Sequence, residues 1–266
     1  MPRRKRSKSE QKLADDAGPD FLEALARGLS VIEAFNRDRR AMSLSDVARL
    51  VDLPRASARR TLLTLVHLGH AETDGRLFRL TPRILRLANA YLSSNAVSDI
   101  LQPALERLSG ELNEACSAAV RDGDEVIMIA HASPNRVLTV SAQIGFRLPA
   151  LSTSLGRVLL AALDDDALDT FLAQTKVPKL TSTTVTDRKK LRGLIVKTRA
   201  EGFSLVDQEA EAGFRSISVP LSRRDGKVIA ALNVGAHSER GTLKTMQSVF
   251  LPKLLALAED LQPQLL

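Results

Sequence analysis

The chain contains a single cysteine, Cys116, among its 266 residues. It can therefore form no intrachain disulfide, and a reducing cytoplasm is the compartment that we expect for it. Long apolar runs are missing too, since no stretch of eighteen apolar residues occurs, and the sequence predicts no membrane span. The basic start, residues 1–8, is not followed by an apolar stretch, so the sequence indicates no secretory signal.

Signatures of catalysis are equally scarce. The sequence has no nucleophile elbow, no glycine-rich phosphate loop and no Cys-x-x-Cys pair. Among the four histidines, only His67 and His70 have a weak metal-ligand spacing, and they are more simply interpreted as surface residues at a helix end. Cys116 lies among small and apolar residues, which is typical of core packing. We therefore predict no enzyme activity, no cofactor and no metal site.

Positive charge is concentrated at one end of the chain. The net charge is +7, and residues 1–95 hold 18 Lys and Arg against 11 Asp and Glu, whereas residues 96–266 hold 20 of each kind. Basic charge confined to one module is expected of a protein that binds nucleic acid. However, residues 1–12 alone contribute six basic residues and one acidic residue. The charge by itself therefore does not establish DNA binding, which has to be argued from the local sequence motif.

Length and composition favour two globular domains, because 44% of the residues are apolar and 26% are charged. Residues 1–20 are polar and are predicted to form a disordered basic arm. Residues 21–80 are predicted to form one domain, residues 81–95 a linker helix, and residues 96–266 a second, larger domain.

Three helices are predicted in residues 21–68. Apolar residues at helical spacing mark the first, between Phe21 and Phe35. Ser43 and Asp46 form a capping-box variant before a short second helix. Pro54 suits the first position of a third helix that ends near Leu68, where its missing N–H costs nothing.

The third helix has an outward face that suits a DNA groove. Ala58, Leu62 and Leu65 are predicted to point inward, whereas small, hydroxyl-bearing and basic residues point outward. Small residues let a helix sit deep in the major groove, and Arg or Ser can bond a base edge or a phosphate.

A hairpin is predicted after this helix, because Asp74-Gly75 separates two extended segments. Three helices followed by such a hairpin indicate a winged helix-turn-helix, whose return strand carries two arginines toward phosphate or the minor groove. The alternative is a generic three-helix domain with solvated arginines. The candidate contacts to double-stranded DNA are Ser43, Arg55, Ala56, Ser57, Arg59, Arg60, Thr64, Arg76 and Arg79.

Thr81-Pro82 opens the next predicted helix, with Thr81 as the N-cap. Its apolar surface is wider than one stripe, which suits a linker that also forms a dimer contact. Simple packing against the wing is the alternative.

Helices and strands intermix in residues 96–266, and several hairpins occur, so we expect an α+β domain with a mainly antiparallel sheet. Segment 145–151 is predicted as an apolar loop that leads to a helix capped by Ser152-Thr153-Ser154. Helices are also predicted over 97–112, 187–201 and 242–261, and strands over 116–120, 126–130, 137–140, 203–207, 216–219 and 228–234.

Two polar features of this domain have more than one interpretation. Asp207, Glu209 and Glu211 alternate, so an extended backbone would place them on one face. They could form an acid–base set, a solvated loop or the polar rim of a ligand cavity. The Ser152-Thr153-Ser154 cap presents hydroxyls at the positive end of a helix, which suits an anion, although plain helix capping is the alternative.

Four motifs of the chain occur in a characteristic order and spacing: Leu53 to Arg60, Gly145 to Leu160, Asp207-Gln208-Glu209 followed by Gly213 to Ile217, and Ala231 to Val234. With them, the chain resembles the IclR family of bacterial regulators over residues 21–262. Within this family, it looks most like regulators of protocatechuate, 4-hydroxybenzoate and β-ketoadipate catabolism. The chain departs from many members at Ser216, where they carry cysteine.

The resemblance implies a GAF-like effector domain that binds a small aromatic or organic acid, and a homodimer or tetramer on a pseudo-palindromic operator. We therefore expect an effector-responsive regulator of aromatic-compound catabolic genes. The alternatives are an enzyme fused to a DNA-binding module and an effector-independent DNA-binding protein. The candidate effector-binding residues are Gly145, Leu148, Pro149, Leu151, Ser152, Thr153, Ser154, Asp207, Glu209, Ser216 and Asn233.

Overall fold

The computed structural model describes residues 18–36, 38–94, 96–134 and 143–265. It divides into two compact units, Met1–Tyr91 and Leu92–Leu266. Most of the predicted basic arm lies outside the described residues, and its last three residues, Gly18–Asp20, form a 3-10 turn. The strand predicted over 137–140 also lies outside the described residues.

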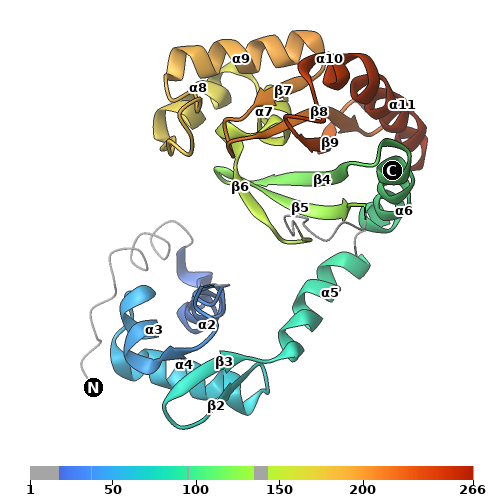
Figure 1. The fold of residues 1–266 in the computed structure, drawn as a ribbon. Coiled ribbons are helices and arrows are strands. Elements are labelled where there is room, and N and C mark those ends of the chain that lie inside the picture. The colour runs from blue at the N-terminus through green and yellow to red at the C-terminus, as the bar shows by residue number, and fades with distance from the viewer. Residues whose placement is uncertain (1–17, 37, 95, 135–142, 266) are drawn as a thin grey trace. The chain divides into compact units, whose positions relative to one another are not determined.

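The first unit is a three-helix domain with a small antiparallel sheet (Figure 1). Val31, Val47 and Leu62 come from the three helices and meet in one core with Phe78 of the hairpin. The sheet has the strand order β1-β3-β2, and its two-residue strand β1 was not predicted. The elements are α2 Glu23–Glu33, β1 Met42–Ser43, α3 Leu44–Leu50, α4 Arg55–His67, β2 Ala71–Thr73 and β3 Leu77–Leu80.

Local capping chemistry sets the ends of these helices. The side chain of Ser43 accepts a hydrogen bond from the backbone N–H of Asp46, whose carboxylate accepts one from the Ser43 N–H, so the predicted capping box is confirmed. Thr81 caps the 3-10 turn Pro82–Ile84, which leads into α5, Leu85–Ser94. Pro54 lies at the N-cap of α4, one residue before the predicted position.

The second unit contains a six-stranded sheet of order β6-β5-β4-β9-β8-β7, in which every pairing is antiparallel. The predicted α+β class is therefore confirmed. Segment 145–151 differs from the prediction, because part of it pairs with β5 as an edge strand. The strands are β4 Ala115–Asp122, β5 Glu125–Ala132, β6 Arg147–Pro149, β7 Ser204–Asp207, β8 Phe214–Ser222 and β9 Val228–His237.

Helices cover both faces of this sheet (Figure 1). On one face, the helices at the two ends of this unit, 96–112 and 251–261, pack with Cys116, Ile217 and Leu232. On the other face, the helices within 154–201 pack with Ala119 and Ala231. The helices are α6 Ala96–Leu112, α7 Ser154–Ala161, α8 Asp165–Gln174, α9 Arg188–Glu201, α10 Leu243–Thr245 and, after a π-helical turn over Met246–Phe250, α11 Leu251–Leu261.

Candidate DNA-binding and effector-binding sites

Helix α4 presents most of the predicted DNA contacts to solvent. Arg55, Ala56, Arg59, Arg60 and Thr64 are all exposed. The Arg55 guanidinium donates a hydrogen bond to the hydroxyl of Ser45 at the start of α3, which fixes its position between the two helices. The Thr64 hydroxyl donates to the Arg60 carbonyl at 2.9 Å. The exposed face of α4 is therefore basic along its first two turns.

Ser57 is the exception on this helix. It is only 6% exposed, so the outward orientation predicted for it is wrong. Helix α4 packs against both α2 and α3, and this requires a buried face wider than the single stripe that the spacing indicated. Ser57 and Ala58 widen that face at the beginning of the helix.

The two arginines of the β2–β3 hairpin differ in their solvent exposure and in their contacts. Arg76 is exposed beside the tip at Gly75, where φ is +89°. Arg79 is half-buried and lies 3.4 Å from the carboxylate of Asp74. Backbone N–H groups of Leu77 and Arg76 donate to Asp74 and hold the pKa of its carboxyl below the ordinary value. The hairpin turn is thus organised by Asp74, and Arg76 is the arginine of the pair that is left open to a partner.

In the second unit, four neutral polar side chains form a buried cluster, which we call the hydroxyl cluster: Ser154, Ser216, Ser218 and Asn233. Ser154 Oγ lies 2.8 Å from the hydroxyls of both Ser216 and Ser218. Asn233 Nδ2 donates to Ser154 Oγ at 3.1 Å and to Ser218 Oγ at 3.0 Å. The structure therefore brings together three predicted site residues from α7, β8 and β9.

Sequence reasoning missed Ser218, which is fully buried. The sequence did contain a signal for Ser218, because residues two apart on a strand share a face and Ser218 is two residues after the predicted site residue Ser216 on β8. What the sequence could not show was the pairing of Ser218 with Asn233 in the register of β8 and β9.

The start of α7 is the polar cap predicted from the sequence. The Thr153 side chain accepts a hydrogen bond from the Gly156 N–H at 3.1 Å and is the N-cap residue. Gly156 is required here, because a Cβ atom would collide with the backbone of Ala150. Among the described residues, the buried hydroxyl of Ser152 has no hydrogen-bond partner. A buried hydroxyl without a partner is costly, and it suits a site that a ligand oxygen would complete.

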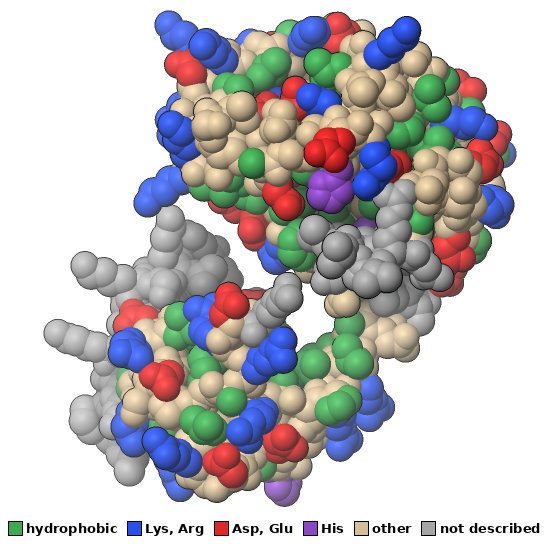
Figure 2. Space-filling view, viewed as in Figure 1, with side chains coloured by type: hydrophobic (Ala, Val, Ile, Leu, Met, Phe, Trp, Pro, Cys, Tyr) green, Lys and Arg blue, Asp and Glu red, His purple; other side chains and the backbone are tan. Residues whose placement is uncertain are grey.

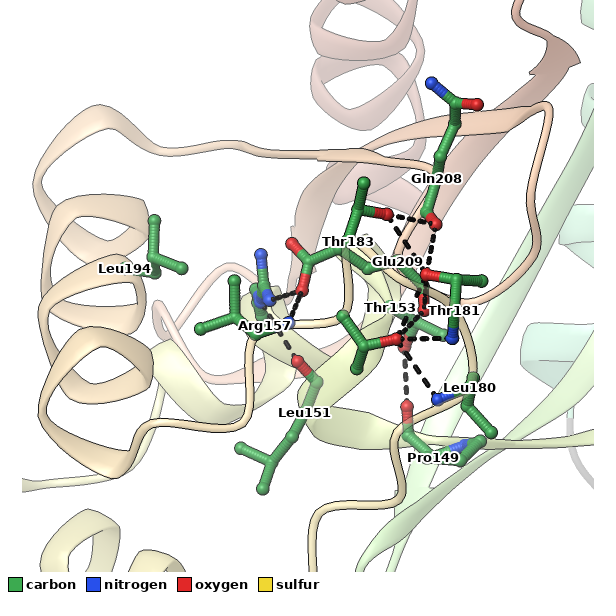
Figure 3. A network of polar contacts seen from close by, with 12 residues as sticks. Pro149, Leu151, Thr153, Arg157, Leu180, Thr181, Thr183, Leu194, Gln208 and Glu209 are labelled. Carbon is green, nitrogen blue, oxygen red and sulfur yellow. Dashed lines mark hydrogen bonds and ion pairs between the residues drawn. The ribbon is translucent and has the colours of Figure 1, made fainter.

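Glu209 takes part in a different arrangement (Figure 3). Arg157 and Glu209 form a buried ion pair at 2.7 Å, with side chains 2% and 9% exposed. The same carboxylate oxygen accepts from the Val185 N–H at 3.0 Å, and Arg157 Nε donates to the Leu151 carbonyl at 3.1 Å. Hydroxyls of Thr181, Thr183 and Thr184 donate to the backbone carbonyls of Gln208 and Glu209 at 2.7 Å.

The shared face predicted for Asp207, Glu209 and Glu211 is wrong. Strand β7 ends at Asp207, and Gln208 has a φ of +60°, which turns the chain out of the extended conformation. Glu209 is then buried against Arg157, whereas Glu211 is exposed. The three carboxylates therefore lie in separate environments, and of the three only Glu211 is in a solvent-exposed loop.

Asp207 is held by an arginine. Arg215 Nε donates to its carboxylate at 2.6 Å, and this interaction holds the pKa of Asp207 below the ordinary value. Arg215 also donates to the carbonyls of Ser238 and Gly241 at 2.9 and 3.1 Å. Asp207 is therefore ionised at neutral pH, and through Arg215 it links the end of β7 to the segment that follows β9.

The predicted apolar segment is divided between surface and core. Gly145 is exposed with a φ of +86°, and Leu148 and Pro149 are half-buried on the edge strand β6. Leu151 is 2% exposed and belongs to the core beneath α7. A cavity of about 340 Å³ lies elsewhere, and is lined by residues of α9, β7 and α10 together with Arg157.

In the part of the chain that the structure describes, no group of three or more His, Cys, Asp and Glu residues is placed to hold a metal ion. No described helix has the length and apolar character that crossing a membrane requires.

Comparison with protein families matches the chain in two segments. Residues 24–75 match the IclR helix-turn-helix domain, and residues 89–262 match the C-terminal domain of the bacterial transcriptional regulator IclR. The Pca regulon regulatory protein of Pseudomonas putida is 44% identical over 248 residues, which are 93% of this chain and 85% of that protein. The p-hydroxybenzoate hydroxylase transcriptional activator of Acinetobacter baylyi is 33% identical over 91% of this chain and 92% of its own length.

Solved structures show the same architecture. A transcriptional regulator from Rhodococcus sp. RHA1 is 42% identical, with a TM-score of 0.81 over 92% of this chain and 98% of that one. An IclR homologue from Microbacterium hydrocarbonoxydans in complex with 4-hydroxybenzoate is 28% identical, with a TM-score of 0.76 over 91% of this chain and 98% of that one.

Proposed function

The chain belongs to the IclR family of bacterial transcriptional regulators, and we propose that it controls genes of aromatic-compound catabolism in response to a small aromatic acid. The names of its relatives support the choice of pathway, since they regulate the Pca regulon and p-hydroxybenzoate hydroxylase. The complex of a related regulator with 4-hydroxybenzoate supports the choice of ligand.

The observation that carries this proposal is the hydroxyl cluster at the start of α7. Its four side chains are neutral donors and acceptors, and it adjoins a helix N-terminus whose first N–H groups favour an anion. In this site the carboxylate of an aromatic acid lies at the start of α7, near the unpartnered hydroxyl of Ser152. The Ser216 hydroxyl accepts from Ser154 and can still donate to a carboxylate oxygen, and the edge-strand residues Leu148 and Pro149 lie beside the ring.

In the DNA complex, α4 enters the major groove and the wing contacts the backbone or the minor groove. Arg59 and Arg60 are exposed on α4 and can bond guanine edges or phosphates, and Arg76 extends from the wing. We infer that the protein binds DNA as a homodimer or tetramer, and two-fold symmetry in the protein is matched by a pseudo-palindromic operator. The effector acts by binding more tightly to one arrangement of the DNA-binding pair than to the other.

A gel-shift titration of the full-length protein on the intergenic DNA upstream of its neighbouring genes tests this proposal. A specific regulator prefers its operator to random competitor by a factor of about 10³ or more. Adding 4-hydroxybenzoate or protocatechuate should change the operator affinity. A preference below tenfold would favour effector-independent DNA binding, and consumption of the acid in a parallel turnover assay would favour an enzyme.

A further inference from the structure

A row of polar side chains crosses the large sheet on the face toward which Ser154 points. His131 on β5 lies opposite Ser117 on β4, and Ser117 lies opposite Asn233 on β9. Directly opposed residues of antiparallel strands project from the same face of a sheet. His131 and Ser117 therefore continue the hydroxyl cluster across two more strands.

The protons of the Ser117–His131 pair can be assigned from hydrogen-bond satisfaction. Ser117 Oγ and His131 Nδ1 are 3.1 Å apart, and Ser117 is only 3% exposed. Among the described residues, Nδ1 is the acceptor within reach of the Ser117 hydroxyl, and a buried hydroxyl is expected to donate. The ring proton of neutral His131 then lies on Nε2. Burial lowers the pKa of His131, which favours this neutral form.

His131 is also held firmly at its backbone. The side-chain amide of Gln102 on α6 donates to the His131 carbonyl at 3.0 Å and accepts from the His131 N–H at 3.2 Å. The imidazole is thus fixed by Ser117 and the backbone by Gln102. Among the described residues no acceptor for its Nε2–H is found, so within this part of the chain the row ends in an oriented donor that a ligand oxygen could accept from.

We propose that His131 is a recognition residue for the effector and that its Nε2–H donates to an oxygen of the aromatic acid. This assignment rests on the proposed function of the hydroxyl cluster. His131 is two strands from Asn233, or roughly 10 Å between backbones at about 4.8 Å per strand. An aromatic acid with oxygens at both ends has a comparable length, so one end can lie near the hydroxyl cluster while the other reaches His131. Ser117 is the positioning residue that keeps the donor on Nε2.

Two substitutions separate recognition from a structural role. His131→Gln keeps a donor near the position of Nε2, whereas His131→Asn keeps only an amide near Nδ1, which still reaches Ser117. Isothermal titration of the full-length variants with 4-hydroxybenzoate and benzoate gives their dissociation constants. We expect His131→Asn to bind about tenfold more weakly or worse, and His131→Gln to stay within about threefold of wild type.

His67→Asn, an exposed change on α4, is the matched control and should leave the affinity unchanged. Weaker binding of both acids places His131 at the carboxylate, and weaker binding of only the hydroxylated acid places it at the ring hydroxyl. Equal affinities in all variants, or a loss confined to His131→Gln, would overturn the assignment. If the wild-type protein binds neither acid, the proposed function itself is contradicted. If the wild-type protein binds but the His131 variants bind equally well, only the role of His131 is contradicted. Melting temperatures without ligand show that each variant is folded.

Discussion

At the scale of single residues, the buried ion pair Arg157–Glu209 joins α7 to the segment that follows β7. It joins residues 52 positions apart and is almost fully enclosed, with Arg157 on α7 and Glu209 just after β7. Ser154, one helical turn before Arg157, belongs to the hydroxyl cluster. The ion pair therefore fixes the helix that presents Ser154.

Removing one partner of this pair should destabilise the protein strongly. Arg157→Met or Glu209→Leu leaves a buried charge without its partner, and we expect the free energy of unfolding to fall by about 3–5 kcal/mol. The double variant Arg157→Met with Glu209→Leu should recover a large part of that loss, because neither charge remains buried. Urea titration followed by circular dichroism measures these values. A loss in the double variant equal to the sum of the two single losses would show that the charges are not coupled.

The thiol of Cys116 should be inert in the native protein. It is fully buried, and burial together with the charge of Glu114 raises its pKa to about 12. The thiolate, which is the reactive form, is therefore scarce at neutral pH. We expect Ellman's reagent to react with no thiol in the folded protein and with one thiol per chain in guanidinium chloride. Rapid reaction under native conditions would contradict the buried position of Cys116.

At the scale of secondary-structure elements, we propose that α4 carries the sequence-specific part of the DNA contact. Arg60→Ala should weaken operator binding more than non-specific binding, by about 1–3 kcal/mol, if its guanidinium bonds a base edge. Arg224→Ala makes the same change of charge on an exposed turn of the other unit and should alter neither affinity. Gel shifts on operator and on random DNA at one salt concentration compare the variants. Equal losses on both DNAs for Arg60→Ala would indicate a phosphate contact alone.

The elements that the sequence predicted well are those specified by their own local residues. Ser43 and Thr81 cap the expected helices, and Asp74-Gly75 lies at the turn of the expected hairpin. These signals act within four residues and need no tertiary context.

The elements and contacts that sequence reasoning missed depend on distant partners. Strand β1 has two residues and exists because it pairs with β3, and β6 exists because it pairs with β5. Likewise, the burial of Ser57 and the pairing of Glu209 with Arg157 depend on helix packing and on a turn at Gln208. Period-two alternation could not show that turn, because it assumes that the strand continues.

At the scale of the whole molecule, the first unit leaves apolar side chains uncovered. Leu22, Leu25 and Leu29 are 70%, 61% and 47% exposed and follow one side of α2 and the residue before it. Leu85 and Tyr91 on α5 are 64% and 46% exposed. Exposed apolar side chains on α2 and α5 favour these helices as contact surfaces in the homodimer that we propose.

Charged substitutions on α2 should therefore separate the subunits without unfolding them. For Leu25→Glu with Leu29→Glu, both side chains are already exposed, so the monomer loses little stability, while a dimer interface would have to bury two carboxylates. We expect sedimentation equilibrium to show a shift toward monomer. Operator affinity should fall by at least about tenfold, because one half-site alone supplies fewer contacts. Leu180→Glu, on an exposed loop of the other unit, is the control. A variant that keeps its oligomeric state but loses DNA binding would instead place α2 at the DNA.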